Sequence, residues 1–360
     1  MENIEKIIKG VKLTKNKKNI CLVTTVYSFF LYLLIKGYNE DDIYIFTAWF
    51  PKEISKNVKH IQMPKVIFRG KKFAELNSIS GIYKNIVGFF KYFYGYLKLR
   101  LLLFIKTFNC DVEVYGHAQT PFSYIFFENT SNIIEDGMEN YTAKICKTHK
   151  INRFIDLILH ICGIYFLNQC ECYGSHKNVK NVYLTNEFNH PLLKDKVQKI
   201  NIKELWNNLS ESEQEKLLEI FNVNIEGIDF TKKTAILLTE PLAESSTINI
   251  TQEEELNMYN KIIDKFSDHQ IIIKPHPRDT KDFEKIFPNM KIIDKSFPIE
   301  MLTMLNIHPT VVCSIVSTAL YNFENSKIYI YDGELNDQIL INARKELLKI
   351  IKEKNLELIH

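Results

Sequence analysis

The sequence of 360 residues lacks several features that would assign a protein to a class at once. It contains no low-complexity segment and no internal repeat. Its formal net charge of +3 is too small to indicate a protein that binds nucleic acid. The seven cysteines show none of the usual zinc-site spacings, since Cys170-Glu-Cys172 is too tight for such a pair. These absences favour a cytoplasmic globular protein with reduced cysteines, which agrees with its 46% hydrophobic and 25% charged residues.

The sequence also lacks an apolar run of transmembrane length near its N-terminus. A run from Ile20 to Ile35 follows several lysines and superficially resembles a signal anchor. It spans sixteen residues, whereas a transmembrane helix needs roughly 20. Polar residues interrupt the run, and no small-residue cleavage site follows it. We therefore predict a buried strand at Ile20–Thr25 that leads into a packed helix at Ser28–Lys36, and no helix that crosses a membrane.

Short apolar runs alternate with helical patterns along the whole chain. This alternation predicts parallel sheets, and the chain length suggests two domains. We expect an α/β fold of two Rossmann-like domains that face each other across a cleft. The expected parts are a first domain at residues 1–185, a helical connection at 186–230, a second domain at 231–331 and a C-terminal helix at 332–360. Further strands are expected at Ile43–Thr47, Val66–Phe68, Asp111–Tyr115, Ser123–Phe127, Ile133–Ile134, Val182–Thr185, Thr234–Thr239, Ile271–Ile273, Lys291–Asp294, Thr310–Ser314 and Lys327–Tyr331, and further helices at Asn152–Phe166, Thr251–Phe266, Ser317–Phe323 and Asp337–Lys354.

A long amphipathic helix with a basic face is expected at Tyr83–Phe108, which is rich in Phe, Tyr and Leu. One interpretation is a core helix whose charges are simply solvated. The other is contact with an anionic membrane surface, because such surfaces attract basic residues that lie beside apolar ones. The basic residues are Lys91, Lys98, Arg100 and Lys106.

The segment Ile271-Ile-Ile-Lys-Pro-His-Pro-Arg-Asp279 is the most informative stretch of the chain. Its three consecutive isoleucines indicate a strand that is buried on both faces, as in a parallel sheet. Pro275 and Pro277 end the strand, because proline has no N–H to donate. His276 therefore stands at the carboxyl end of a strand, which is where open α/β sheets bind ligands. A lone histidine is more often structural, but this setting favours a functional one.

Two carboxylate motifs also follow predicted strands. Glu135-Asp136-Gly137 places a carboxylate on a tight turn, where the glycine permits a positive φ. Thr239-Glu-Pro-Leu-Ala-Glu244 comes directly after another strand. Either motif alone is also compatible with an ordinary acidic loop, so neither identifies a site by itself.

Hydroxyl groups follow a further strand, in Ser314-Ile-Val-Ser317-Thr318-Ala319. A helix N-terminus is a favourable site for an anion, although Ser and Thr there also act as caps. A phosphate at Ser317 and Thr318, a proton donor at His276 and a carboxylate from the other domain would together suit a transferase with a phosphate leaving group.

Taken in order, Glu-Asp-Gly, Lys-Pro-His-Pro-Arg, Pro-x-Glu and Ser-Thr resemble the motifs of bacterial sialyltransferases. The sequence most resembles glycosyltransferase family 52, the lipooligosaccharide and capsule sialyltransferases. The resemblance covers most of the chain, and its specific parts lie between Glu135 and Asn322. It implies a GT-B architecture, CMP-sialic acid as the donor substrate, and no required cofactor. The implied acceptor is a terminal sugar, galactose above all, on a bacterial surface glycan.

The resemblance also implies roles for individual residues. His276 would assist the departure of CMP, and Glu300 would bind its ribose. Ser317 and Thr318 would hold the phosphate. The other residues that the resemblance and the motifs bring into the site are Lys274, Pro277 and Arg278 for CMP, and Glu135, Gly137, Thr239 and Glu240 as additional candidates.

The general base stays open between two regions of the chain. Related families use the aspartate of the Asp-Gly turn, which is Asp136 here. Family 52 places the base after the strand that precedes the His-Pro strand, where this chain offers Glu240 and Glu244. We favour Asp136 slightly, because a short side chain on a glycine turn is better fixed than a glutamate in a polar loop.

The expected reaction is an inverting one. The base deprotonates an acceptor hydroxyl, which attacks the sialyl donor while His276 and the hydroxyl groups neutralise the departing phosphate. The chain contains no Asp-x-Asp, so no bridging divalent metal is expected. The expected partners are a nucleotide-sugar donor and a glycan acceptor, which is usually lipid-linked in the family that the chain resembles, and a homodimer is an open option. Contact between the basic helix and lipid would place the protein peripherally on the inner face of the membrane.

Three alternatives compete with this interpretation. The first keeps the architecture but uses another nucleotide sugar, such as a UDP-hexose. The second is a CDP-polyol phosphotransferase, although those enzymes usually carry an aspartate where Val316 precedes Ser317. The third is a non-catalytic, membrane-associated protein that organises polysaccharide synthesis, against which the intact set of polar motifs argues.

Overall fold

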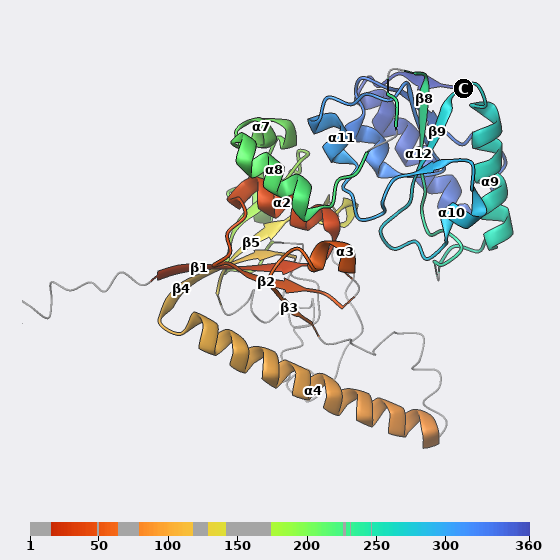
Figure 1. Cartoon of the computed structure of the whole chain (residues 1–360). Coiled ribbons are helices and arrows are strands. Elements are labelled where there is room, and N and C mark those ends of the chain that lie inside the picture. Colours follow the sequence, from red (N-terminus) through yellow and green to blue (C-terminus); the bar gives the residue numbers. More distant parts are fainter. Residues whose placement is uncertain are drawn as a thin grey trace, which may run out of the picture. The chain divides into compact units, whose positions relative to one another are not determined.

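The computed structural model describes residues 16–48, 50–63, 79–117, 129–141, 174–225, 228–230, 232–245 and 247–360, with the backbone alone at 79–92 and 138–139. It divides into two compact units, Met1–Gln214 and Glu215–His360. Each unit contains one sheet with helices packed on it (Figure 1). The described helices are α2 (Val26–Lys36), α3 (Lys52–Ser55), α4 (Ile79–Thr107), α7 (Ile202–Asn207), α8 (Glu211–Ile220), α9 (Gln252–Lys265), α10 (Phe283–Ile286), α11 (Glu300–Met304) and α12 (Gln338–Glu353), with short 3-10 helices η2 (Met138–Tyr141), η4 (Pro191–Leu193) and η5 (Thr318–Asn322).

The sheet of the first unit has seven strands in the order β3-β2-β1-β4-β5-β6-β7. Every neighbouring pair is parallel. Its strands are β1 (Asn16–Val23), β2 (Ile43–Phe46), β3 (His60–Gln62), β4 (Cys110–Gly116), β5 (Thr130–Ile134), β6 (Val179–Leu184) and β7 (Val197–Lys199).

The sheet of the second unit has six strands in the order β10-β9-β8-β11-β12-β13. All its neighbouring pairs are parallel as well. Its strands are β8 (Thr234–Leu238), β9 (Gln270–Lys274), β10 (Lys291–Ile292), β11 (Val311–Ser314), β12 (Lys327–Ile330) and β13 (Leu358–Ile359).

Both sheets therefore have the doubly wound order of a Rossmann fold. In each, the first strand of the unit lies in the middle, and the chain first builds outward on one side and then on the other. The order reverses between β1 and β4 in the first unit and between β8 and β11 in the second. Open α/β sheets bind ligands in the crevice outside the carboxyl ends of the strands at such a reversal. These two places are where a functional site is expected.

Helices cover both faces of the first sheet (Figure 1). Helix α2 packs on β1, β4 and β5, and begins at a capping box in which Thr25 and Ser28 satisfy each other's backbone N–H groups. On the other face, α4 buries Tyr96, Leu99 and Leu103 in a core with side chains of β1, β2 and β4. The predicted first βα unit is thus confirmed as strand β1 followed by helix α2.

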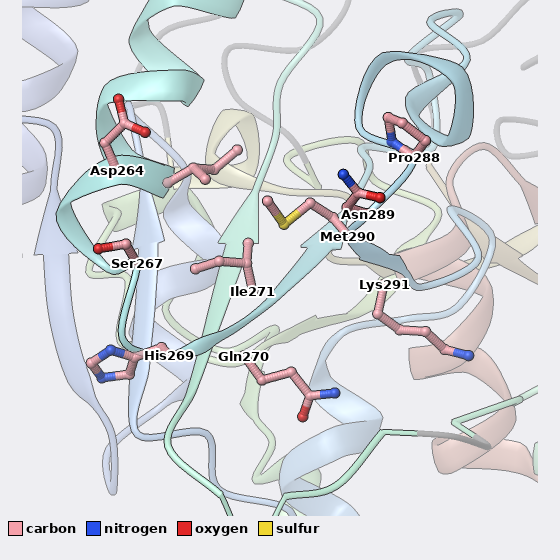
Figure 2. A pocket seen from close by; sticks show the side chains of 10 residues that line it. Asp264, Ser267, His269, Gln270, Ile271, Pro288, Asn289, Met290 and Lys291 are labelled. Atoms are coloured by element: carbon pink, nitrogen blue, oxygen red, sulfur yellow. The ribbon is translucent and has the colours of Figure 1, made fainter.

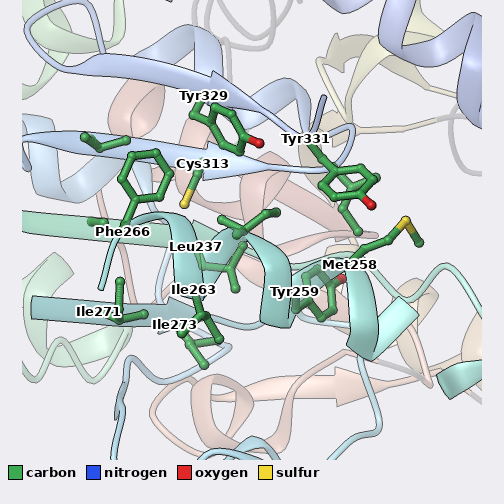
Figure 3. Close-up of a cluster of buried hydrophobic side chains, with 14 of the residues drawn as sticks. Leu237, Met258, Tyr259, Ile263, Phe266, Ile271, Ile273, Cys313, Tyr329 and Tyr331 are labelled. Atoms are coloured by element: carbon green, nitrogen blue, oxygen red, sulfur yellow. The ribbon is translucent and has the colours of Figure 1, made fainter. Parts of the chain in front are cut away.

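The core of the second unit lies between its sheet and α9 (Figure 3). Tyr259, Ile262 and Phe266 pack against inward side chains of β8, β9, β11 and β12. Helix α9 starts at the predicted capping box, in which Thr251 and Glu254 exchange hydrogen bonds. This core fixes the strands whose ends carry the site.

Most predicted elements are confirmed within a few residues, but three short strands were not predicted. They are β3, β7 within the segment expected to be a helical connection, and β13 after the C-terminal helix. The long helix expected at Tyr83–Phe108 is α4. Among the described residues, no helix combines the length and apolar character needed to cross a membrane. Outside the described residues lie the predicted elements Val66–Phe68, Ser123–Phe127 and Asn152–Phe166, and the Cys170-Glu-Cys172 motif.

Candidate functional site

Three adjacent strands of the second unit bring candidate residues to one edge of the sheet. Glu240 follows β8, His276 follows β9, and Ser317 follows β11. Because β8 lies between β9 and β11, Glu240 stands between the other two along that edge. This edge includes the reversal between β8 and β11, so the sequence motifs converge where a ligand is expected.

The imidazole of His276 is oriented by the backbone of its own loop. Its Nδ1 accepts the Arg278 backbone N–H at 3.1 Å, and the backbone N–H of His276 donates to the Thr239 hydroxyl at 3.3 Å. With Nδ1 acting as an acceptor, the neutral ring carries its proton on Nε2. The ring can therefore donate one hydrogen bond from Nε2.

His276 is neutral at physiological pH. Burial, together with the positive charges of Arg278 and Lys274, lowers its pKa to about 4, and Glu244 offsets part of this effect. Protonation would also oppose the amide hydrogen bond to Nδ1. Without a bound anion, His276 is a hydrogen-bond donor and not an acid.

The loops after β8 and β9 are joined by side chains on both. The buried Thr239 hydroxyl donates to Asp279 Oδ2 at 3.3 Å. The Glu244 carboxylate accepts the Thr280 hydroxyl at 2.7 Å and the Thr280 N–H at 3.2 Å. Burial alone would raise the pKa of Glu244, but these bonds and the nearby Lys281 hold it below its ordinary value. Glu244 is therefore an ionised carboxylate in the same loop pair as His276.

A buried ion network that the sequence analysis missed lies beneath these loops. The Lys281 ammonium, with 4% of its side chain exposed, lies 2.9 Å from Glu255 and 3.2 Å from Asp279. Burial alone would lower the pKa of Lys281, but its hydrogen bonds and opposite charges raise it above the ordinary value. Glu255 also accepts the Ala243 N–H at 2.9 Å. Because it spans α9 and both loops, this network fixes the ends of β8 and β9 together.

Glu240 contacts the hydroxyl groups of the third motif. Ser314 Oγ lies 3.2 Å from both carboxylate oxygens of Glu240, and the Ser317 hydroxyl is also hydrogen-bonded to this carboxylate. The Ser317 N–H donates to Ser314 Oγ at 3.0 Å. Burial raises the pKa of Glu240 to about 7, against the lowering effect of both serines. The loop after β8 and the loop after β11 thus meet through this carboxylate.

The predicted helix Ser317–Phe323 is present only as the five-residue 3-10 helix η5. Ser317 precedes it but makes no side-chain cap hydrogen bond, and Thr318 is exposed. A helix this short has little dipole to attract a phosphate. An anion here would depend on the hydroxyl groups and neighbouring side chains.

Two predicted CMP-binding residues have partners within the protein. The buried Glu300, the first residue of α11, accepts a hydrogen bond from Asn322 at 3.0 Å. The buried Lys274 ammonium donates to the carbonyl groups of Pro275 and Lys295, at 2.9 and 3.1 Å. Burial lowers the pKa of Lys274 to about 8. Glu300 remains oriented toward the η5 side, whereas Lys274 chiefly ties two loops together.

The remaining predicted residues of this loop lie nearer the solvent. Pro277 is half-buried, and the Arg278 side chain is exposed. Arg278 contributes through its backbone N–H, which orients His276. Its guanidinium is available to a ligand at the rim of the site.

The first unit has its own set of polar groups at the carboxyl edge. Asp136 Oδ1 accepts the hydroxyls of Thr24, at 2.9 Å, and of Thr25, both directly after β1. Its backbone N–H donates to Asn140 at 2.8 Å. Gly137 has a φ of 140°, as the turn prediction required. Asp136 is thereby held in a single place next to the reversal between β1 and β4.

Glu135 has a structural role, and the unpredicted His117 lies close to Asp136 in the order of the strand ends. The buried Glu135 accepts the Thr185 N–H at 2.6 Å and the Tyr141 hydroxyl at 2.8 Å, so it links β5 to β6. His117 is 3% exposed and directly follows β4, between the ends of β1 and β5. His117 follows the predicted strand Asp111–Tyr115, and Thr24 and Thr25 end the predicted strand Ile20–Thr25, so their places at strand ends could have found them.

A hollow of about 610 Å³ elsewhere in the second unit is not this site (Figure 2). Gln270 and Lys291, which line it, are the first residues of β9 and β10. It therefore lies at the amino ends of the strands, at the opposite edge from His276. The polar groups, and not the hollow, identify the candidate site.

Known proteins are similar to this chain in sequence and in fold. An uncharacterized protein of Haemophilus influenzae is 29% identical over 333 residues, which cover 90% of this chain and 97% of that protein. The 2,6-sialyltransferase of Photobacterium sp. JT-ISH-224, solved with CMP and lactose, aligns with a TM-score of 0.53 and 12% identity over 95% of this chain and 78% of its own. The GT-B domain of a Photobacterium damselae sialyltransferase aligns with a TM-score of 0.52 and 13% identity, over 95% of this chain and 99% of its own.

The structural likeness is too low in sequence identity to show more than the fold, which is the GT-B fold. The family assignment comes from the sequence itself. The model of glycosyltransferase family 52 matches residues 83–335, well over half of the chain and including the carboxyl-edge motifs of both units. The chain therefore belongs to glycosyltransferase family 52.

Proposed function

We propose that this chain transfers sialic acid from CMP-sialic acid to a hydroxyl group of a terminal galactose on a lipooligosaccharide or capsule glycan, with inversion at the anomeric carbon. The observation that carries the proposal is the grouping of Glu240, His276 and Ser317 on three adjacent strand ends. Family membership supports a sialyl donor. The CMP and lactose in the similar Photobacterium 2,6-sialyltransferase support the choice of nucleotide and acceptor sugar.

The second unit binds the nucleotide in this proposal. His276 donates a hydrogen bond from Nε2 to the phosphate as CMP departs, where negative charge grows. The hydroxyls of Ser317 and Thr318 bind the same phosphate, and Arg278 lies at the rim of the nucleotide site. Glu300, oriented by Asn322, binds the ribose hydroxyl groups.

The first unit binds the acceptor and supplies the general base. Asp136 takes the proton of the acceptor hydroxyl, and Thr24 and Thr25 hold its carboxylate in place for that task. Glu244 is the competing base, because it is ionised and lies in the loop pair that carries His276. A base needs to approach the reacting hydroxyl within about 2.6–3.2 Å, directly or through one water.

The proposed reaction needs no metal ion. A departing CMP carries one phosphate, so less charge requires neutralisation than with a nucleoside diphosphate. The sequence also lacks Asp-x-Asp, the carboxylate pair that often bridges a metal to a nucleotide. Hydrogen-bond donors alone are expected to suffice for this leaving group.

Peripheral attachment to the inner face of the membrane is part of the proposal. The side chains of Tyr94, Leu97, Leu101 and Phe104 on α4, and of Phe108 directly after it, are between 48% and 70% exposed and recur every three or four residues. One helical face is therefore apolar and exposed. The exposed basic residues of the same helix are Lys98, Arg100 and Lys106, whereas the Lys91 side chain lies outside the described part.

Flotation with anionic liposomes tests this attachment. We expect binding at low salt that weakens at high salt, because charged headgroups attract the basic residues. Replacing Leu101 and Phe104 with Glu should abolish it. A wild-type protein that stays unbound at low salt would contradict the attachment and leave the transfer reaction untouched.

Thermal unfolding with CMP, UMP, CDP and UDP tests the choice of nucleotide. A ligand at about 100 times its dissociation constant adds about 2.7 kcal/mol of stability, so the preferred nucleotide should raise the melting temperature most. We expect CMP to give the largest shift. If UDP gives the largest shift, a UDP-hexose donor is favoured, and if CDP does, a CDP-polyol donor is favoured. If no nucleotide shifts the melting temperature, a non-catalytic protein is favoured.

A further inference from the structure

Glu240 occupies the centre of the nucleotide site without having been given a task there. Strand β8, which it follows, lies between β9 and β11, so Glu240 stands between His276 and Ser317 along the sheet edge. Its carboxylate lies 3.2 Å from Ser314 Oγ and is hydrogen-bonded to the Ser317 hydroxyl. The carboxylate therefore already uses the hydroxyl group that the proposed function assigns to the phosphate.

An ionised Glu240 and a phosphate would conflict at this place. Both are anions, and both would need the Ser317 hydroxyl as a donor. Like charges that share a site disfavour ionisation of one of them. The conflict disappears when Glu240 is protonated, because a neutral carboxyl group carries no charge and gains an O–H donor of its own.

We propose that Glu240 is protonated when a nucleotide phosphate is bound, and that its neutral carboxyl group forms part of the phosphate-binding site. This inference rests on the proposed function. It makes Glu240 a binding residue for the phosphate and couples the binding of CMP to the uptake of one proton.

The surroundings of Glu240 make this protonation easy. Burial raises its pKa to about 7, and the negative charge of Glu255 on α9 raises it as well. The Tyr259 hydroxyl from the same helix bonds the backbone of Glu240, at 3.0 Å from its N and 2.9 Å from its O. From the β11 side, the hydroxyls of Ser314 and Ser317 and the Val316 backbone N–H bond the carboxylate, and all three are uncharged. The ionisable groups of the neighbouring β9 loop are Lys274, His276, Arg278, Asp279 and Lys281.

Protonation also suits the transfer step. When the bond from the anomeric carbon to the phosphate oxygen breaks, its electron pair stays on that oxygen. The phosphodiester with one negative charge becomes a monoester with close to two at pH 7. A carboxylate beside Ser317 would oppose this growth of charge, whereas a neutral carboxyl group does not.

The affinity for CMP as a function of pH tests the proposal. We would measure it by calorimetry between pH 7 and 9, a range in which CMP stays a dianion because its second pKa is about 6. Only the protonated form of Glu240 accommodates the phosphate, so the wild-type affinity should fall about tenfold per pH unit above pH 8. Titrations in two buffers with different heats of ionisation should show uptake of about one proton at pH 8. Glu240→Gln, which is neutral at every pH, should bind CMP with an affinity that does not change with pH.

Controls separate Glu240 from its neighbours. Glu253→Gln changes an exposed residue of α9 and should keep the wild-type pH dependence. If the CMP affinity of Glu240→Gln still falls with pH, the titrating group is Lys274 and the proposal is overturned. Burial lowers the pKa of Lys274 to about 8. The melting temperature of each variant checks that it is folded. If Glu240→Gln does not fold, Lys274→Gln takes its place: proton uptake that this variant keeps supports Glu240, and proton uptake that it loses overturns the proposal.

The outcomes also distinguish this inference from the proposed function. CMP that binds wild type at constant affinity, without proton uptake, would overturn the role of Glu240 and leave the sialyltransferase proposal intact. Failure of CMP to bind wild type at any pH would overturn both. Cytidine, which has no phosphate, should bind without proton uptake, and uptake with cytidine would show that the proton does not belong to the phosphate site.

Discussion

The two units have sheets of the same strand order but very different side chains at their carboxyl edges. In the first unit, the Asp136 carboxylate is held by neutral groups, the hydroxyls of Thr24 and Thr25. In the second unit, the edge carries several ionisable residues, and the buried Lys281–Glu255 ion pair lies beneath their loops. The common fold provides a place for a site at each strand reversal, but the side chains at that place determine the chemistry of the site. One edge is suited to a single fixed base, and the other to an anion whose charge changes.

The sharpest test of this comparison is which edge supplies the base. Asp136→Asn should lower turnover by about 10²–10⁴-fold, the usual effect of losing a general base, with little change in CMP affinity. Glu244→Gln is the matched variant in the other unit and should lower turnover far less. Both are measured at saturating donor. An active Asp136→Asn beside an inactive Glu244→Gln would move the base to the second unit.

Replacing His276 with Ala should lower turnover by at least about 10²-fold while CMP still binds. The reason is that its Nε2–H contact strengthens only as negative charge grows on the phosphate. Steady-state turnover and CMP affinity measured on the same preparation check it. Nearly normal turnover would make His276 a structural residue that merely connects the loops after β8 and β9.

Lys281→Met should lower the free energy of unfolding by about 3–5 kcal/mol, because it leaves buried carboxylates without a counter-charge. Chemical denaturation measures this loss. Lys285→Met is the matched control: its side chain is 84% exposed in a surface pair with Asp282, so stability should change little. Equal effects of the two variants would show that the network does not support the second edge.

Thr24→Val should lower turnover by about tenfold, because one of the hydrogen bonds that hold the Asp136 carboxylate is lost. CMP affinity should not change, since we propose that the nucleotide binds to the other unit. Thr130→Val, at the amino end of β5, is a control that should behave as wild type. Unchanged turnover in Thr24→Val would show that Asp136 needs no such support, or is not the base.

The sequence predicted those parts of the fold and site that local patterns encode. Three isoleucines and two prolines define the end of β9 and so place His276, and Gly137 defines the turn of Asp136. The strand β3 was missed because its three residues, His60–Gln62, contain a single apolar side chain. An apolar run is the main signal for a buried strand.

Contacts between distant segments could not be predicted. Lys281 and Glu255 each look like ordinary surface charges in the sequence, and only the packing of α9 under both loops buries them together. The same holds for Glu240, which the sequence placed among the additional candidates. Its bonds to Ser314 and Ser317 depend on the order of β8 and β11, which local patterns do not specify.

The most direct test of the account is sialyl transfer by the purified protein. CMP-sialic acid, UDP-hexoses and CDP-polyols would each be offered with lactose and other galactose-terminated acceptors in the presence of a metal chelator, and the products identified by mass spectrometry. We expect a sialylated acceptor and an equal amount of CMP, formed from CMP-sialic acid without a metal. Transfer from a UDP- or CDP-linked donor alone, or no transfer from any of them, would contradict it.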